Sequence, residues 1–75
     1  MKDYENVGGD SPIVAYESGE GKIKIRFTDG TVYLYTCRDT GCANVEQMQK
    51  YAAIGHGLYG FMKRFLDKGA GTRIS

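Results

Sequence analysis

The sequence contains no tryptophan, a single proline and a single histidine, and only two of its 75 residues are cysteines. Two thiols and one imidazole cannot complete the four-ligand shell of a structural zinc site, so no metal is expected. No apolar run approaches the roughly 20 residues that cross a bilayer, and the N-terminus lacks the basic and apolar stretches of a secretory signal. These absences predict a cytoplasmic protein without a membrane partner.

Net charge is also scarce, because ten basic residues face nine acidic ones and leave a formal charge of +1. Such a balance gives no bulk attraction to nucleic acid or anionic lipid, so electrostatic binding depends on how the charges are arranged. The 41% apolar residues, six tyrosines and three phenylalanines predict a packed core. We expect one domain over residues 11–69, with a flexible arm over residues 1–10 and a flexible tail over residues 70–75.

The two cysteines, Cys37 and Cys42, lie in the segment CRDTGC. Glutathione keeps such thiols reduced in the cytosol, so two free, half-buried cysteines are expected and a disulfide is not. Catalysis by His56 with either cysteine is not expected either, because no group that orients the histidine and no pocket is evident. The sequence therefore predicts a protein that is not an enzyme and needs no cofactor.

Three segments have the pattern of β-strands. Residues 13–16 are β-favouring and follow Pro12, which predicts a short edge strand. Residues 22–27 alternate between apolar and basic side chains, as in a strand with one buried face. Residues 31–37 follow Asp29-Gly30, a dipeptide typical of a two-residue type I′ hairpin loop.

That loop would fix the register of the hairpin, because it places Thr28 opposite Thr31. Ile25 would then face Leu34 on the core side. The opposite face would alternate basic and aromatic side chains, namely Lys22, Lys24, Arg26, Tyr33 and Tyr35.

Two helices are predicted after the strands. Asn44 is placed to cap the first helix, with Gln47 reaching back, and this helix should run to about Ala53. The second should span about residues 58–68 on a wide apolar stripe and end at Gly69. The expected fold is thus α+β of order βββαα, a three-stranded antiparallel meander packed by two C-terminal helices.

The basic and aromatic face suggests a nucleic-acid ligand, since tyrosine rings stack on bases while Lys and Arg contact phosphates. Lys63 and Arg64 on the last helix would extend this surface. The alternative interpretation is an ordinary solvent face, in which basic stems cover tyrosine rings. A different class of function also stays open, a module that docks on a protein partner through its edge strand or helix surface.

Residues 55–60 match G-x-G-x-x-G. In a dinucleotide-binding fold this loop follows a strand, and an acidic residue comes about 20 residues later. Here a helix precedes the loop and the sequence given stops before that position, so a glycine-rich turn between helices is predicted. Amides at the start of the second helix could still hold an anion.

A set of residues follows a defined order and spacing from Ser11 to about Phe65, namely Ser11, Ile13, Tyr16, Ile23, Ile25, Phe27, Gly30, Tyr33, Tyr35, Ala53 and Gly57. In this order and spacing the chain resembles the KTSC domain, a small bacterial module also found at the C-terminus of some lysyl-tRNA synthetases. The resemblance implies no established activity, and the synthetase context implies RNA as a ligand. Three features depart from the family: no Val-Pro step follows the tyrosine pair, Gly55 stands in place of a serine, and Leu58-Tyr59-Gly60 replaces Tyr-Phe-Asn.

Overall fold

The computed structural model describes residues 1–6, 9, 11–66 and 71–74. In this part of the chain the strands are β1 (Lys2–Asp3), β2 (Ile13–Gly19), β3 (Lys22–Phe27), β4 (Val32–Thr36) and β5 (Thr72–Arg73). The helices are α1 (Cys37–Thr40), α2 (Cys42–Ile54) and α3 (Leu58–Phe65).

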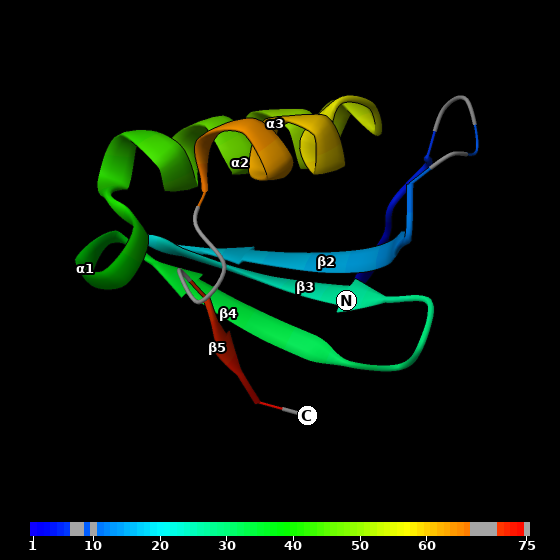
Figure 1. Cartoon of the computed structure of the whole chain (residues 1–75), viewed down its shortest axis with the longest axis horizontal. Coiled ribbons are helices and arrows are strands. Elements are labelled where there is room, and N and C mark those ends of the chain that lie inside the picture. The colour runs from blue at the N-terminus through cyan, green and yellow to red at the C-terminus, as the bar shows by residue number, and fades with distance from the viewer. Residues whose placement is uncertain (7–8, 10, 67–70, 75) are drawn as a thin grey trace.

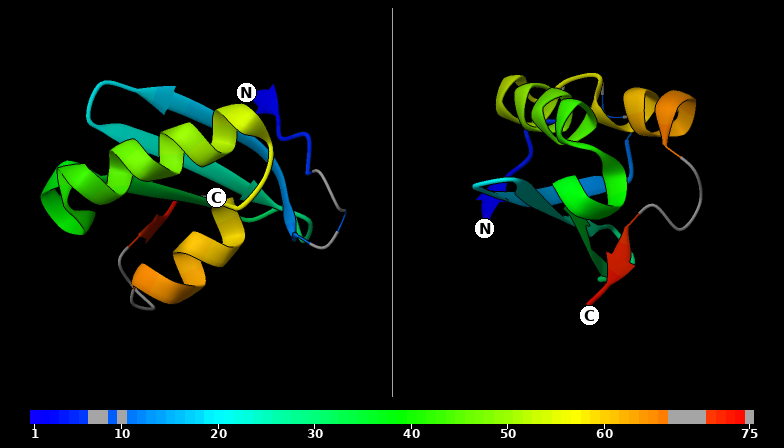
Figure 2. Two further views of the ribbon diagram at one scale, coloured as in Figure 1. Left: turned by 90° about the horizontal axis from the view of Figure 1, so that it is seen from above. Right: turned by 90° about the vertical axis from the view of Figure 1, so that its left-hand side faces the viewer.

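The strands form one antiparallel sheet in sequence order, β1-β2-β3-β4-β5. Both α2 and α3 lie on one face of the sheet, and α1 lies at one end (Figure 1). The views in Figure 2 show α2 and α3 side by side above the strands. The fold is therefore α+β with an antiparallel sheet, as predicted. The predicted order βββαα is wrong, because the sheet has five strands and the helices lie between β4 and β5 in the chain.

Both additional strands lie in segments that are predicted to have no regular structure. In the predicted arm, β1 pairs with β2, and Tyr4 is buried while its N–H donates to the Val14 carbonyl at 3.0 Å. In the predicted tail, β5 pairs with β4. Two-residue strands are too short to show alternation in sequence, so their pairing depends on the neighbour that they meet. Residues 7, 8, 10, 70 and 75 of these segments lie outside the described residues.

The turn between β3 and β4 corrects the predicted hairpin. Its two hydrogen bonds run from the Gly30 N–H to the Phe27 carbonyl and from the Phe27 N–H to the Thr31 carbonyl, both at 2.9 Å. This pattern encloses a loop of residues 28–30, with Gly30 at a φ of 89°. A type I′ turn needs a positive φ at both central residues. Among the described non-glycine residues Asn6 alone has a positive φ, so Asp29 does not meet this requirement.

The Asp29 side chain stabilises this longer loop. Its Oδ1 accepts hydrogen bonds from the Thr31 N–H at 2.9 Å and from the Thr31 hydroxyl at 2.7 Å. The hydroxyl bond, which favours the charged carboxylate, holds the pKa of Asp29 below its ordinary value. The structure thus uses Asp29-Gly30 in a type I turn followed by a glycine bulge, the common three-residue alternative to the two-residue loop.

One extra residue in the loop moves the register by one position. Ile23 pairs with Tyr35 and Ile25 pairs with Tyr33, whereas Leu34 pairs with Lys24. Because side chains alternate across a strand, the shift exchanges the two faces of β4. The predicted pairing of Ile25 with Leu34 is therefore wrong.

The strand β2 is longer than predicted and is not an edge strand. It extends to Gly19 and lies between β1 and β3. Near its start Ile13 pairs with Phe27 and Ala15 with Arg26, which leaves Val14 as an additional, exposed residue at 38% exposure. Such a bulge reverses the side-chain alternation after it.

The core fills the space between the sheet and the two longer helices. Ile23 and Ile25 from β3 and Met48 and Leu58 from the helices are 0% exposed. Within the described residues, the buried members of this core cluster are Tyr4, Ile13, Tyr16, Ile23, Ile25, Tyr35, Val45, Met48, Ala52, Leu58 and Met62.

The helix boundaries also differ from the predictions. The one-turn helix α1 has no predicted counterpart, and α2 begins at Cys42 rather than at a cap on Asn44. The Asn44 side chain instead donates to the Thr40 carbonyl at 2.9 Å. The helix α3 ends at Phe65, and Lys68 and Gly69, which were expected to end it, lie outside the described residues.

Candidate functional site

The predicted basic and aromatic face of β3 and β4 does not exist as one surface. Lys22, Lys24 and Arg26 share a side of β3, but the register places Tyr33 and Tyr35 on the side of Ile23 and Ile25, toward the helices. Tyr35 is only 7% exposed. The basic side chains and the tyrosine rings, which were predicted to share one surface, therefore lie on opposite faces of the sheet.

The basic side of β3 is partly neutralised by its neighbours. Lys24 lies opposite Glu17 of β2, and its Nζ is 3.4 Å from the Glu17 Oε2. Lys22 extends its aliphatic stem over Gly19, where a β-carbon added to the glycine would meet the Lys22 Cε at 2.8 Å. Arg26 lies opposite Ala15. Since the rings lie on the other face of the sheet, the basic stems do not cover them, and this part of the alternative interpretation is wrong as well.

The tyrosines instead form a ring cluster under the edge of α3. Phe27 contacts Tyr33 edge to face with 5.8 Å between centroids, and Tyr33 stacks on Tyr35 at 6.5 Å. These rings and Tyr59 of α3 line a shallow hollow with a volume of about 510 Å³, with Asp29 at its rim. The cluster is mainly part of the packing between sheet and helix.

Burial gives Tyr35 a distinct titration. Loss of hydration, with a smaller contribution from Tyr33, raises the pKa of Tyr35 from 10.0 to about 12. Because the unfolded residue ionises first, the stability that Tyr35 contributes is fully present below pH 10 and is lost as the pH rises to about 12. We expect a transition near pH 12 in the ultraviolet titration of the folded protein, and Tyr35→Phe should remove it. A titration curve that Tyr35→Phe leaves unchanged at this pH would contradict the burial of this ring.

A second aromatic surface lies on the helices, where sequence reasoning expected ordinary helix packing. The rings of Tyr51 and Phe61 lie 5.5 Å apart and those of Phe61 and Phe65 lie 5.0 Å apart, measured between centroids. Phe65 is 64% exposed and Ile54, one turn after Tyr51 on α2, is 60% exposed. We call this surface the α2–α3 groove, lined by Tyr51, His56, Gly57, Gly60, Phe61, Arg64 and Phe65, with a volume of about 320 Å³.

Glycines give the groove its shape. A β-carbon at Gly60 would meet nothing within 4 Å, so this position leaves open space beside the rings. A β-carbon at Gly57, which has a φ of 87°, would lie 3.0 Å from the Tyr51 ring. The Gly57 position thus lets the ring approach the backbone, and the sequence signal for it was the G-x-G-x-x-G match.

The two basic residues predicted on the last helix have different surroundings. Lys63 places its Nζ 5.4 Å from the centroid of the Tyr59 ring, in cation–π geometry. Arg64 lines the α2–α3 groove. Neither is positioned to extend a surface on the opposite face of the sheet, since both belong to α3.

The first three residues of the G-x-G-x-x-G segment, residues 55–57, form a turn between α2 and α3, as predicted, and the other three begin α3. The Leu58 N–H, at the start of α3, donates to the Tyr4 hydroxyl at 3.3 Å. The Tyr4 hydroxyl therefore occupies the Leu58 N–H, one of the amides that an anion would need to bind here.

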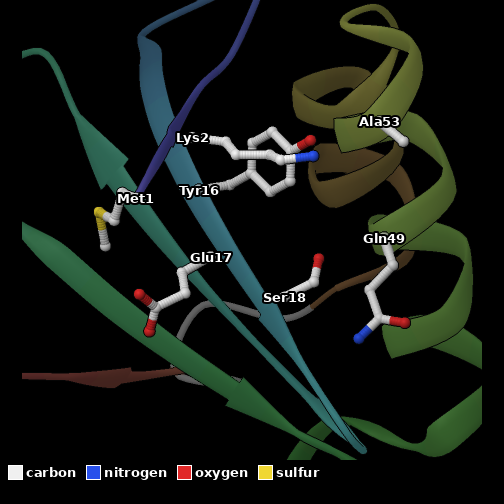
Figure 3. Close-up of a pocket in the computed structure, with 7 residues that line it drawn as sticks. All are labelled: Met1, Lys2, Tyr16, Glu17, Ser18, Gln49 and Ala53. Carbon is white, nitrogen blue, oxygen red and sulfur yellow. The ribbon is translucent and has the colours of Figure 1, made fainter.

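A third hollow lies between α2 and the N-terminal strands (Figure 3). It has a volume of about 580 Å³ and is lined in part by Lys2, Glu17 and Gln49. Gln49 uses its side-chain amide to bind the Gly19 and Lys22 carbonyls, both at 2.9 Å. The Gln49 amide in this hollow thus attaches α2 to the sheet.

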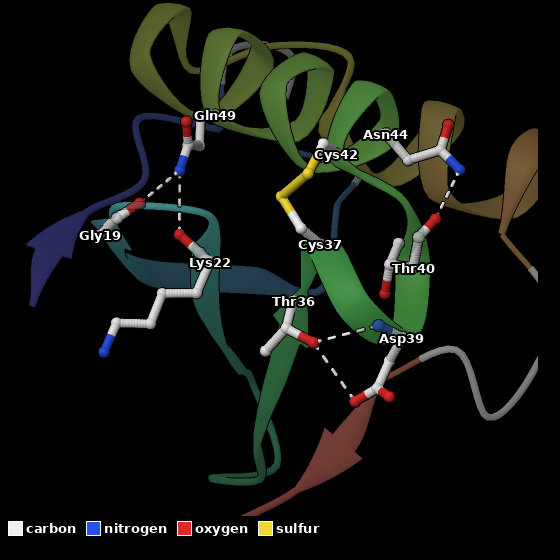
Figure 4. The surroundings of a disulfide bond; sticks show 9 residues. All are labelled: Gly19, Lys22, Thr36, Cys37, Asp39, Thr40, Cys42, Asn44 and Gln49. Atoms are coloured by element: carbon white, nitrogen blue, oxygen red, sulfur yellow. Dashed lines mark hydrogen bonds between the residues drawn. A yellow bond between two sulfur atoms is a disulfide. The ribbon is translucent and has the colours of Figure 1, made fainter.

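The cysteine prediction is wrong, because Cys37 and Cys42 form a disulfide (Figure 4). The single turn of α1 brings their Cα atoms to 4.1 Å, and Gly41 with a φ of 96° turns the chain into α2. In the described residues no three His, Cys, Asp or Glu side chains gather as a metal site would require. Within the same residues, no helix is both long and apolar enough to cross a membrane.

Comparison with known proteins adds no relative to this picture. No family model matches the chain, and searches of curated proteins and of solved structures find no match.

Proposed function

We propose that the chain is a non-enzymatic binding module that docks an acidic peptide segment of a partner protein in the α2–α3 groove. The observation that carries the proposal is Phe65, which is 64% exposed although its ring contacts that of Phe61 in tilted geometry, with 5.0 Å between centroids. Exposed apolar side chains that are continuous with a packed cluster are typical of protein interaction sites. The resemblance to the KTSC domain supports a binding role and stays a prediction.

The charge of the helices favours an acidic partner. Arg64 lines the groove, and α2 and α3 together contain Lys50, Lys63 and Arg64 against a single carboxylate, Glu46. Opposite charge across an interface steers association and disfavours basic partners. Glu5, which lies against Gly55, is an acidic group from elsewhere in the chain near the adjoining turn.

The shape of the groove favours a side chain with an aromatic or branched aliphatic end. Its volume of about 320 Å³ suits one or two such side chains rather than a whole domain. An amphipathic helix presents anchors of this kind at i, i+3, i+4 and i+7. We therefore expect a small, transient interface in which one apolar anchor enters beside Gly60 and carboxylates lie near Arg64.

Nucleic-acid binding by Lys22, Lys24, Arg26, Tyr33 and Tyr35 is the less favoured proposal. Base stacking requires accessible ring faces near the cations, whereas Tyr35 is buried and Lys24 is paired with Glu17. On α3, Lys63 lies over Tyr59 and leaves Arg64 as the cation that lines the groove. Neither β3 nor α3 therefore presents a continuous row of cations that a phosphate backbone could follow.

A binding titration tests the proposal. The probe is a labelled amphipathic peptide with glutamates on one face and phenylalanine and leucine on the other, and a uridine oligomer serves as the nucleic-acid probe. We expect saturable peptide binding that Phe65→Ser weakens by about tenfold, as loss of a central anchor does. Arg64→Glu should also weaken it, while Lys22→Glu on the other face of the sheet should leave it unchanged.

Two outcomes would overturn the docking proposal. One is peptide binding that is absent, or that is unaffected by Phe65→Ser. The other is saturable binding of the uridine oligomer that Phe65→Ser leaves intact and that Lys22→Glu abolishes, which would restore the strand surface.

A further inference from the structure

We propose that Cys37 and Cys42 are a dithiol–disulfide redox centre that exchanges with small-molecule thiols, with Cys42 as the reacting cysteine and Cys37 as the resolving one. This inference is independent of the α2–α3 groove. It rests on the position of the disulfide at the junction of β4, α1 and α2, shown in Figure 4.

The two sulfurs differ in accessibility. Cys42 is exposed at the first residue of α2, whereas Cys37 is half-buried at the first residue of α1, directly after β4. A β-carbon added to Gly21 would lie 3.5 Å from the Cys37 Sγ, so the turn between β2 and β3 lies against the inner sulfur. Thiol–disulfide exchange requires access to the attacked sulfur. An incoming thiolate therefore reaches Cys42 first.

Backbone and side-chain bonds hold this junction without the sulfur–sulfur bond. The Cys37 N–H donates to the Gly21 carbonyl and the Gly41 N–H donates to the Cys37 carbonyl, both at 2.9 Å. Thr36 caps α1 by accepting from the Asp39 N–H at 3.2 Å. These contacts keep the two cysteines close after reduction, so the bond can form again.

Further bonds hold α2 itself. Asn44 binds the Thr40 carbonyl at 2.9 Å, and Gln49 binds the Gly19 and Lys22 carbonyls at 2.9 Å each. The disulfide joins two cysteines that are five positions apart in the sequence. A disulfide that closes such a short loop stabilises the folded state less than one that closes a long loop. Reduction should therefore leave the fold intact, as a reversible centre requires.

The start of α2 favours the thiolate form of Cys42. This helix has 13 residues, and no side chain caps its first turn. Unpaired amides at a helix N-terminus stabilise a thiolate and make it the reactive member of a pair. The helix α1 has four residues and is capped by Thr36, so Cys37 lacks a comparable environment.

The reaction then has two balanced steps. A small-molecule thiolate attacks the Cys42 Sγ, the Sγ–Sγ bond breaks, and its electron pair leaves with Cys37, which takes a proton from water. A second thiolate attacks the sulfur that was added, releases Cys42 as a thiolate, and departs in the small-molecule disulfide. In total the protein disulfide gains two electrons from two thiolates, which become one small-molecule disulfide, while Cys37 gains one proton from water and Cys42 ends as a thiolate.

Single-cysteine variants test the assignment. Cys37→Ser keeps Cys42 alone and Cys42→Ser keeps Cys37 alone, and each is incubated with oxidised glutathione and quenched with acid. Mass spectrometry should show that the glutathione mixed disulfide forms on Cys42 about tenfold faster than on Cys37, as accessibility and thiolate character require. The variant that lacks both cysteines should gain no mass.

Wild-type protein supplies the second measurement. Glutathione should reduce it while its far-ultraviolet circular dichroism stays unchanged, and alkylation followed by peptide mapping should place the trapped intermediate on Cys42. Equal or faster reaction at Cys37 would overturn the assignment of roles. Loss of the fold on reduction, or a bond that glutathione leaves intact, would show a purely structural disulfide.

Discussion

Replacement of Tyr35 by alanine is expected to lower the free energy of unfolding by about 3 kcal/mol, in the range found when a buried large side chain is truncated. Tyr35 is 7% exposed and lies opposite Ile23, in the cluster between the sheet and the helices. Truncation removes this ring from the core and leaves a cavity beside Tyr33. Since small domains are only marginally stable, a loss of this size is a large part of the total.

The adjacent position provides the matched comparison. Leu34 is only half-buried and pairs with Lys24, on the face of the sheet that lies away from the helices. We expect Leu34→Ala to cost about 1 kcal/mol, because less apolar area returns to water. Urea denaturation of both variants measures the difference. A larger loss in Leu34→Ala than in Tyr35→Ala would show that the hairpin has the register of a two-residue Asp29-Gly30 loop.

Replacement of Tyr4 by alanine should lower the free energy of unfolding by about 3 kcal/mol, again as a buried aromatic truncation. This residue lies in the segment that the sequence marks as an arm, yet it is 6% exposed and belongs to the core cluster. Its hydroxyl also accepts the Leu58 N–H at 3.3 Å and so connects the N-terminal segment to the start of α3.

A conservative change separates the two contributions of Tyr4. Tyr4→Phe keeps the ring but leaves the Leu58 N–H without this acceptor, which should cost about 1 kcal/mol. Lys2→Ala, at an exposed position of β1, should stay within about 0.5 kcal/mol and serves as the control. If thermal or urea denaturation shows that Tyr4→Ala is as mild as Lys2→Ala, the N-terminal segment is the arm that the sequence suggested.

The surfaces of β3 and β4 show which features a local sequence pattern does not predict. The alternation of residues 22–27 is visible in sequence and correctly places Ile23 and Ile25 in the core. The partner face on β4 depends instead on one loop residue, because Asp29-Gly30 suits both a two-residue loop and a three-residue loop with a glycine bulge. That single choice separates Tyr33 and Tyr35 from the basic side chains.

The α2–α3 groove and the disulfide were missed for related reasons. Phe61 and Phe65 belong to an apolar stripe with helical spacing. Such a stripe predicts that one face of the helix is buried, but it does not predict which ring at the edge of that face stays exposed. The pairing of Cys37 with Cys42 needs the turn of α1, a four-residue helix with no detectable period. The G-x-G-x-x-G match did mark the turn that shapes the groove, although its usual meaning does not apply here.

Elements that repeat a pattern over several residues could be predicted from the sequence: the α+β composition, the strand over residues 22–27, its antiparallel connection to the next strand, and two amphipathic helices. The strand register, the two short outer strands and the disulfide follow from the folded chain alone. The physical reason is that periodicity reports which side of an element is apolar, whereas pairing depends on turn dihedral angles and on contacts between distant segments.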